Sequence, residues 1–358
     1  MKHFYFDMVF TAIALMIAGW WGYSHGGVAA MMSGVFITLI LAAMEISLSF
    51  DNAVVNASVL KTWDKFWKMI FLTVGILVAV FGMRLLFPIV IVAVTADMGM
   101  GEVVKMALHN PAAYSARLNA HHAEISAFGG MFLLLVFLNF MFDEKEVMWF
   151  KWLERTLARF GKIEAISVFV SLSALLALLS LVDDFKKLAV LTAGVAGILV
   201  YLGVNVVSSL IEGADDDDKT TPDVIEGKEV AGAIAKGGIA GFLYLEVLDA
   251  SFSFDGVIGA FAITNDVIII MLGLAIGAMF VRSMTIFLVE KGTLDEFVYL
   301  EHGAHYAIGA LAVIMLLSMK FHIPEIVTGL IGIAFIVWAL ANSISHKKKI
   351  AKLESTLI

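Results

Sequence analysis

The sequence predicts an all-α polytopic membrane protein, with about ten transmembrane helices in two inverted five-helix repeats. Hydrophobic residues make up 61% of the 358 positions and charged residues 16%, whereas soluble domains average about 45–50% and about 25%. Apolar runs of roughly 20 residues, long enough to span a bilayer, recur along the whole chain. An internal duplication places carboxylates inside two of these runs. These three observations predict the fold class.

The candidate spans follow one another with short connections. They cover residues 4–22, 28–60, 66–94, 123–142, 164–182, 186–211, 231–263, 267–289, 302–319 and 325–345. The spans 28–60 and 231–263 are too long for one straight crossing, so each is expected to contain a break or bend. The first five spans correspond in order to the last five. Because five crossings is an odd number, the second repeat would run upside down relative to the first, as in secondary transporters.

This correspondence predicts the organisation of the chain. Residues 1–185 would form the first transmembrane repeat and residues 186–345 the second, with residues 346–358 as a basic tail. Arg84 in the third span then corresponds to Arg282 in the eighth. The acidic loop 212–230 lies between the first two spans of the second repeat. We interpret it as a solvated linker or, alternatively, as a surface that gathers cations.

The distribution of Lys and Arg predicts the orientation. Ten spans put both termini on one side, together with loops 61–65, 143–163, 212–230 and 290–301. Most of the 24 basic residues lie on that side, including the HKKK sequence at 346–349. The positive-inside rule therefore predicts a multi-pass protein of the cytoplasmic membrane with both termini in the cytoplasm.

The duplicated motif is the most informative feature of the sequence. Residues 45–59 read EISLSFDNAVVNASV and residues 249–263 read DASFSFDGVIGAFAI. Glu45 aligns with Asp249 and Asp51 with Asp255, and the second copy adds Glu246 three residues before Asp249. Ionisable side chains inside a membrane are costly and usually face a pathway or a bound ion. Two copies of such a set are typical of a transporter with an internal repeat.

Helical spacing orders these polar residues. One stripe carries Glu45, Ser49, Asn52 and Asn56, because their spacing brings them to one helix face. Asp51 lies roughly 120° away at ideal spacing, so only a helix unwound around residues 49–52 could aim both acids at one point. In the second copy Asp249 and Ser253 occupy the stripe, and Gly256, in place of Asn52, would make a break easier.

The donor chemistry of the motif predicts the ligand class. Carboxylate, hydroxyl and amide oxygens suit Mg²⁺, Ca²⁺ or Mn²⁺. The alternative is that Arg84 and Arg282 pair with the acids and hold the bundle together. Two arginines cannot neutralise five acids, so a cation or a proton must cover the remainder. The predicted metal set is Glu45, Asp51, Asn52, Glu246, Asp249 and Asp255, supported by Ser49, Ser253, Arg84 and Arg282.

Other parts of the sequence narrow the function further. The chain has no cysteine, which excludes thiolate metal sites and disulfides. It has no phosphate-binding loop and no nucleophile–base pair, so we expect neither an enzyme nor an ATP-driven pump, and no cofactor is required. Basic residues are dispersed, which argues against nucleic-acid binding. Whether His121, His122, His302 and His305 bind metal stays open, as does the oligomeric state.

The two motifs, EISLSFDNAVV and LEVLDASFSFDGVIGAFAIT, resemble the TerC/Alx family of bacterial integral membrane proteins, within the lysine-exporter-like superfamily. The resemblance is specific over residues 45–58 and 246–264 and looser over 28–345. The additional spans make the chain similar to a long-form subfamily. The resemblance implies divalent metal export, Mn²⁺ foremost, through the acids named above, with tellurite resistance as an older label for some members. Ca²⁺ stays possible because it also prefers oxygen ligands. Gly256 departs from Asn52 of the first copy and makes the site asymmetric.

The sequence therefore favours a gradient-driven exporter of divalent cations, coupled to protons or counter-ions, in the bacterial cytoplasmic membrane. A second hypothesis is a non-transporting membrane scaffold in a metal or tellurite stress response, which would dock partners through the acidic loop. Deleting residues 214–219 discriminates between them, because a scaffold would lose its function and an exporter would keep most of its flux.

Overall fold

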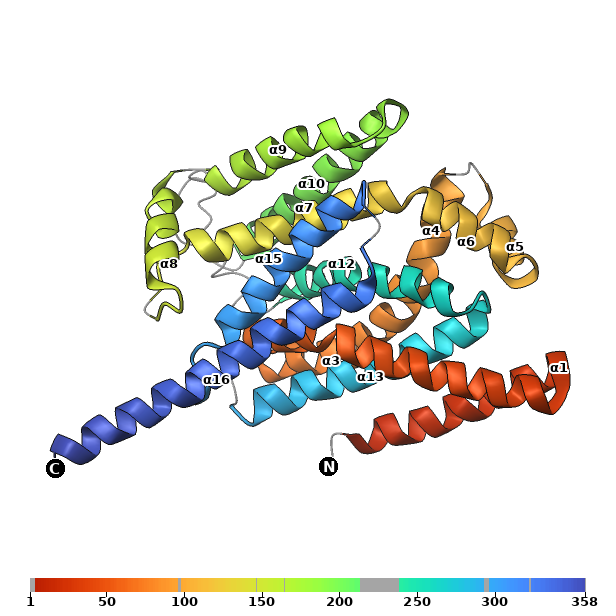
Figure 1. Ribbon diagram of the computed structural model, residues 1–358, viewed down its shortest axis with the longest axis horizontal. Coiled ribbons are helices and arrows are strands. Elements are labelled where there is room, and N and C mark those ends of the chain that lie inside the picture. Colours follow the sequence, from red (N-terminus) through yellow and green to blue (C-terminus); the bar gives the residue numbers. More distant parts are fainter. Residues whose placement is uncertain are drawn as a thin grey trace.

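The computed structural model contains only helices among the residues that it describes, which are 4–95, 98–145, 147–163, 165–212, 238–292, 296–321 and 323–357. Most helices lie roughly side by side, and α8 runs across them at one end (Figure 1). The first half comprises α1 (Tyr5–Leu48), α2 (Phe50–Leu60), α3 (Lys65–Leu77), the π-helix η2 (Val78–Leu86), α4 (Phe87–Thr95), α5 (Met100–His109), α6 (Pro111–Ala120), α7 (His122–Phe142), α8 (Lys151–Ala158), η3 (Phe160–Lys162), α9 (Ile166–Leu178) and η4 (Leu179–Leu181). The rest comprises η5 (Asp184–Lys186), α10 (Lys187–Glu212), α12 (Ile239–Ile263), α13 (Val267–Glu290), α15 (Leu300–Ser318) and α16 (Glu325–Leu357).

The structure supports a polytopic membrane protein. Seven of the described helices are long and apolar enough to cross a bilayer, or eight if the bent pair α8–α9 forms one span. Two features lower this number below the ten spans that the sequence predicts. The long α1 is counted once although it folds back on itself, and every stretch of α12 long enough to span contains three acidic residues, Glu246, Asp249 and Asp255.

The fold-back of α1 occurs at a glycine pair. Gly26 and Gly27 leave the helical conformation, and Gly27 has a φ of 69° that side chains other than glycine rarely adopt. The two halves then lie close together, and a Cβ on Gly34 would stand 3.2 Å from the carbonyl oxygen of Ala18. This break separates the first two predicted spans.

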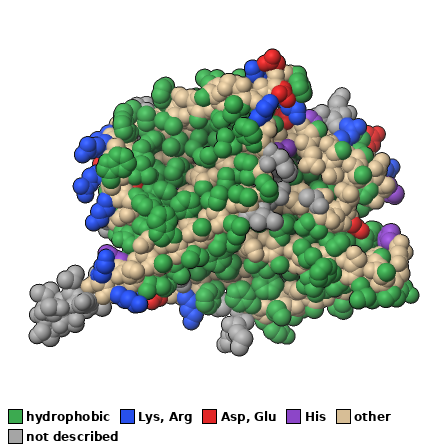
Figure 2. Space-filling model, viewed as in Figure 1, with side chains coloured by type: hydrophobic (Ala, Val, Ile, Leu, Met, Phe, Trp, Pro, Cys, Tyr) green, Lys and Arg blue, Asp and Glu red, His purple; other side chains and the backbone are tan. Residues whose placement is uncertain are grey.

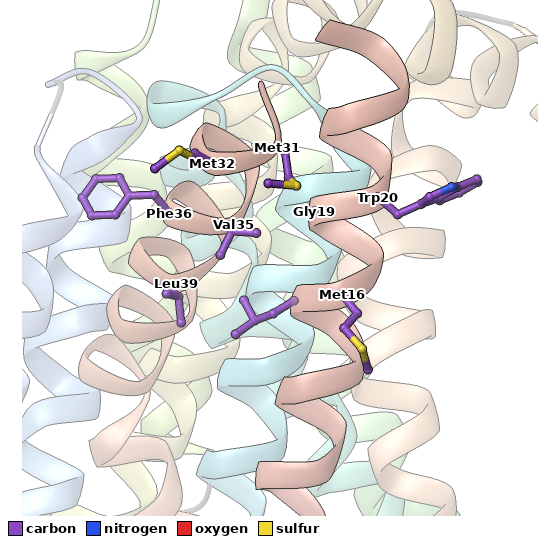
Figure 3. Close-up of a pocket in the computed structure, with 9 residues that line it drawn as sticks. Met16, Gly19, Trp20, Met31, Met32, Val35, Phe36 and Leu39 are labelled. Atoms are coloured by element: carbon purple, nitrogen blue, oxygen red, sulfur yellow. The ribbon is translucent and has the colours of Figure 1, made fainter. Parts of the chain in front are cut away.

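An open apolar groove follows the α1 hairpin on its outer surface. Its lining side chains come from both halves of α1 and include Met16, Trp20, Met32 and Phe36 (Figure 3). No charged side chain lines it. The groove has the composition of a lipid-facing surface, and nothing in it suggests a polar ligand.

Three helix starts follow directly from the local sequence. Asp64 accepts a hydrogen bond from the backbone N–H of Trp67 at the start of α3 (2.8 Å). Asn110 caps α6 ahead of Pro111, whose missing N–H costs nothing at the first helical position. Asp266 caps α13 by accepting from the backbone of Ile268 and Ile269.

Contacts between distant segments define one end of the bundle. At this end lie the loops that the sequence analysis predicts to be on the same side of the membrane as the two termini. The contacts are Lys61–Glu301 (3.7 Å), Lys347–Glu296 (2.6 Å), His302 to the carbonyl of Val147 (2.9 Å) and the ring pair Phe4–Phe287 (6.4 Å). The loops 61–64 and 143–150 therefore share an end with residue 4 and with the part of α16 near residue 347.

The opposite end gathers the other turns of the chain. Its contacts are Trp21–Asp266 (2.9 Å), Lys186 to the carbonyl of Ala120 (2.8 Å), Lys320–Asp183 (3.3 Å) and the rings of Tyr114 and Phe261 (5.7 Å). The α1 fold-back, the α5–α6 hairpin and the α12–α13 turn therefore share this end (Figure 1).

The two long motif segments differ from the expectation that both contain a break. The first breaks at Ser49 (φ −104°, ψ 17°), between α1 and α2. The second is a continuous helix from Ile239 to Ile263, so no break falls within the motif itself, and Gly238, with a φ of 118°, lies outside the regular helix just before it. Its helix begins only at Ile239, and the 25 residues of α12 have the length of a single crossing.

Candidate functional site

The acidic motifs lie where two apolar cores meet. One core contains Leu245 and Leu248 of α12, and the other contains Val257 and Phe261 of the same helix. The polar residues between them are removed from solvent, and Glu45 is only 1% exposed. Charged groups in such a place need opposite charges, hydrogen bonds or a bound ion.

The break at Ser49 is smaller than the predicted unwinding. The backbone N–H of Ser49 still donates to Glu45 (3.0 Å), and that of Ala53 donates to Ser49 (3.2 Å). The carbonyls of Glu45 and Ser49 are therefore not freed as ligands. The Ser49 hydroxyl instead donates to Oε1 of Glu45 (3.1 Å), which fixes the carboxylate on the predicted stripe.

Arg84 links the two copies of the motif. It lies on the π-helix η2, and its Nη2 donates to Oε1 of Glu45 in a short charge-assisted hydrogen bond. Its Nη1 lies 3.8 Å from Oδ2 of Asp249 and donates to the carbonyl of Ala79 (2.9 Å). The guanidinium therefore lies between an acid of each copy, as the pairing alternative predicted.

Arg282 is held differently. It extends from the regular helix α13 and donates to the carbonyls of Phe71 (2.9 Å) and Gly75 (3.0 Å) on α3. It also pairs with Oε1 of Glu246 (3.2 Å) and stacks on the ring of Phe71. Arg282 thus ties three helices together, whereas all its partners but one are neutral.

The two motif copies contact each other through equivalent positions. Nδ2 of Asn52 donates to Oδ1 of Asp249 (2.7 Å). A Cβ on Gly256 would stand 2.8 Å from Oε2 of Glu45. Because Glu45 aligns with Asp249 and Asn52 with Gly256, each contact is the counterpart of the other. Gly256 therefore provides room for the Glu45 carboxylate. The sequence suggested that Gly256 would ease a break, but α12 is continuous at this position.

Asp51 does not converge with these groups. Its carboxylate faces α16, where a Cβ on Gly332 would stand 2.9 Å from Oδ2. Oδ1 accepts from the backbone N–H of Asn52 (3.0 Å). No described residue forms an ion pair with it. The side chain of Asp255, also a predicted ligand, lies outside the described part of the chain, and so does the acidic loop from residue 213 onward.

Several buried oxygens of the motifs have no hydrogen-bond partner among the described residues. They belong to α2 and α12 and are the kind of atoms that bind hard cations. They are Oδ1 of Asn52, Oδ1 of Asn56, Oε2 of Glu246, Oδ2 of Asp249 and Oγ of Ser253. Unsatisfied buried polar atoms are rare in folded proteins. Each of these five oxygens can bind water or a cation.

Comparison with known proteins assigns the chain to a protein family. A protein-family model described as a protein of unknown function (DUF475) matches residues 50–350. The chain belongs to the DUF475 family. No curated protein matches the chain, and no solved structure matches it. The matched range includes Asp51, Asn52 and all of the second motif, and Glu45 lies just before it.

The carboxylates of this DUF475 protein are not preassembled around one point. Among the described residues, no group of three or more Asp, Glu and His side chains is arranged to hold a metal ion. The arginines explain this, because Arg84 holds Glu45 and Asp249 while Arg282 holds Glu246. Three of the motif carboxylates are therefore held by arginines in this structure.

The four histidines of interest make local contacts. His302 hydrogen-bonds Val147 and lies 3.4 Å from Glu154, and His305 stacks on Phe140. His121 lies 3.5 Å from Glu124. His122 is near Ser126, at 3.5 Å. Both pairs lie at helix ends, away from the acidic motifs.

Sequence reasoning missed the role of Gly75. A Cβ there would stand 2.6 Å from Nη1 of Arg282 and 2.6 Å from Oε1 of Glu246. Only glycine leaves room for this pair against α3. The signal in the sequence was a glycine in the middle of the apolar third span.

Gly75→Ala is expected to lower the free energy of unfolding of this DUF475 protein by about 1–3 kcal/mol, because the added methyl overpacks the Arg282–Glu246 pair. Reversible unfolding in mixed detergent micelles measures the change. Gly203→Ala on α10 is the control, since a Cβ there meets nothing within 4 Å. Equal stability of Gly75→Ala and the wild-type chain would contradict the close packing described here.

Proposed function

We propose that the chain is a gradient-driven exporter of divalent cations, with Mn²⁺ as its main substrate, in the bacterial cytoplasmic membrane. The observation that carries the proposal is the set of unpartnered buried oxygens on α2 and α12 beside arginine-held carboxylates. The described acids of the motifs, Glu45, Asp51, Glu246 and Asp249, outnumber the two buried arginines. The remaining negative charge favours occupation by a cation or a proton.

The arrangement of the arginines supports a division of roles. Arg84 balances Glu45 and Asp249 while the site holds no cation, and a cation that binds there takes its place. Glu45, Asp249 and Asn52 then supply oxygens from both motif copies. Asp51 and Asp255 are further ligands by their place in the motifs. Arg282 stays bound to the carbonyls of α3, so that Glu246, with one free oxygen, serves as an additional ligand or proton carrier.

The proposed topology has ten crossings in two inverted repeats. The contacts at the two ends of the bundle support it, because successive turns of the described chain alternate between the ends. The paired contacts Glu45–Gly256 and Asn52–Asp249 support the inversion, since two equivalent helices related by a two-fold axis in the membrane plane meet through such pairs. The positive-inside rule places the end with Lys61 and Lys347 in the cytoplasm.

The choice of ion rests on the donor set and on the motif resemblance. All the candidate donors are oxygens, which favours Mn²⁺, Ca²⁺ or Mg²⁺ over soft ions. Neutral amide oxygens such as that of Asn52 suit Mn²⁺ or Ca²⁺ better than Mg²⁺, which keeps its waters. The resemblance of the motifs to TerC/Alx proteins favours Mn²⁺.

Transport by the purified chain in proteoliposomes tests the proposal. We expect Mn²⁺ flux that accelerates with an opposing proton gradient and is little affected by Mg²⁺, with Ca²⁺ and Zn²⁺ as competing ions. Deletion of residues 214–219 should leave most of the flux, which separates transport from the scaffold hypothesis. Absence of flux for all four ions, in folded and oriented protein, would overturn the proposed function.

A further inference from the structure

The short helix α8 is oriented unlike the helices around it. The segment Lys151–Lys162 makes an angle of 105° with the segment Ile166–Leu181 that follows. In Figure 1, α8 runs down the left edge, across the direction of α7 and α15. A helix perpendicular to a transmembrane bundle, at the end where that bundle leaves the bilayer, lies in the plane of the membrane surface.

One face of α8 anchors it to the bundle. Glu154 is 1% exposed and accepts hydrogen bonds from the backbone N–H groups of Trp149 (3.2 Å) and Phe150 (3.1 Å). The hydroxyl of Tyr306 on α15 donates to the same carboxylate (3.1 Å). Ala158, one turn later, is also buried. These contacts hold α8 in a defined position against the bundle.

A face of α8 beside the anchoring one is basic. Lys151, Arg155 and Arg159 are exposed, and their i, i+4 spacing puts them on one side of the helix. Figure 2 shows Lys and Arg side chains gathered along the edge of the molecule that α8 occupies. None of these three forms an ion pair with a described residue. Lys162, at the end of η3, lies 3.9 Å from Glu144.

Apolar side chains lie beside this basic face. Trp152 is 81% exposed, Phe160 47% and Ile163 53%. Tryptophan favours the boundary between lipid headgroups and acyl chains, where its ring is apolar and its N–H is wet. Basic residues with an adjacent aromatic belt, on a helix in the membrane plane, match an anionic bilayer surface in both charge and polarity.

We infer that the exposed face of α8, formed by Lys151, Trp152, Arg155 and Arg159, is a binding surface for the headgroups of anionic phospholipids. The guanidinium and ammonium groups contact the lipid phosphates while Trp152 enters the acyl boundary. This inference requires only that the bundle spans a membrane, and it holds whichever solute the protein carries.

Quenching by brominated lipids tests the surface in the full-length protein. The protein is reconstituted in phosphatidylcholine bilayers that contain phosphatidylglycerol, with bromine on the acyl chains of one lipid or the other. The difference between wild-type and Trp152→Phe fluorescence isolates Trp152 among the seven tryptophans. We expect brominated phosphatidylglycerol to quench this signal about twofold more than brominated phosphatidylcholine at equal mole fraction, because the basic face enriches the anionic lipid locally.

In the triple variant Lys151→Gln, Arg155→Gln, Arg159→Gln, the two brominated lipids should quench the Trp152 fluorescence equally. The matched control Lys347→Gln, Lys348→Gln, Lys349→Gln removes the same charge from the same end of the molecule and should keep the preference. Equal quenching in the wild type, or loss of the preference in both triple variants, would overturn the inference. If the α8 variant does not fold, the salt dependence of quenching in the wild-type protein tests the inference instead. Its preference should vanish at 1 M salt, where the screening length falls to about 3 Å, and persistence would count against headgroup binding.

Discussion

Asp51→Asn is expected to reduce Mn²⁺ flux by at least about tenfold and to leave the bundle folded. A tenfold reduction corresponds to a rise of about 1.4 kcal/mol in the activation free energy of the rate-limiting step. Asp51 is 6% exposed and its Oδ1 accepts a hydrogen bond from the backbone N–H of Asn52. Since no described residue pairs with its charge, the substitution leaves no arginine without its acid. The change removes a ligand charge at constant shape. Initial rates of Mn²⁺ transport in proteoliposomes measure it.

Asp266→Asn is the control for the same chemical change outside the motifs. Asp266 caps α13 and accepts from Trp21 at one end of the bundle. Because asparagine also caps helices well, flux and folding should stay close to those of the wild type. Full flux in a folded Asp51→Asn variant would show that this carboxylate is not part of the transport pathway.

Arg282→Gln is expected to be the most destabilising substitution, by about 3–5 kcal/mol, because it leaves the buried carboxylate of Glu246 without its counter-charge. It also removes the hydrogen bonds that join α13 to the carbonyls of Phe71 and Gly75 on α3. Unfolding in mixed micelles of increasing denaturing detergent measures the loss, and a failure to recover folded protein agrees with the same expectation.

A double variant separates charge from packing. Arg282→Gln combined with Glu246→Gln removes both charges and should regain most of the lost stability, because no uncompensated charge remains buried. Lys291→Gln, on the exposed residue just after α13, should change stability by less than about 0.5 kcal/mol. If Arg282→Gln unfolded like the wild type, the ion pair with Glu246 would have no structural role.

The sequence predicts the elements that depend on local pattern. The apolar runs, the boundary before residue 28 and the break near Ser49 follow from composition and periodicity. The sequence also predicts that Arg84 and Arg282 face the acids. It does not reveal which acid each arginine holds, because that depends on the depth and rotation of neighbouring helices.

Three short helices were missed for a related reason. The predicted spans leave residues 95–122 and 143–163 as connections, and these stretches contain α5, α6 and α8. Helices of eight to ten residues are marginal by themselves and form when tertiary contacts hold them. For α8 that contact is Glu154 with Tyr306. Such a contact joins residues too distant in the chain for a periodic pattern to show.

The π-helix η2 has a consequence for how Arg84 could leave the acids. A π-helical stretch carries one residue more than an α-helical ladder of the same rise can hold. Passing that residue along the helix turns a side chain by roughly 100° about the axis, while both ends of the helix stay in place. Rewinding the nine residues of η2 would in this way move the Arg84 guanidinium away from Glu45 and Asp249. The speed of cation exchange would then follow the breaking of a few backbone hydrogen bonds and would not require the slower rocking of whole helices.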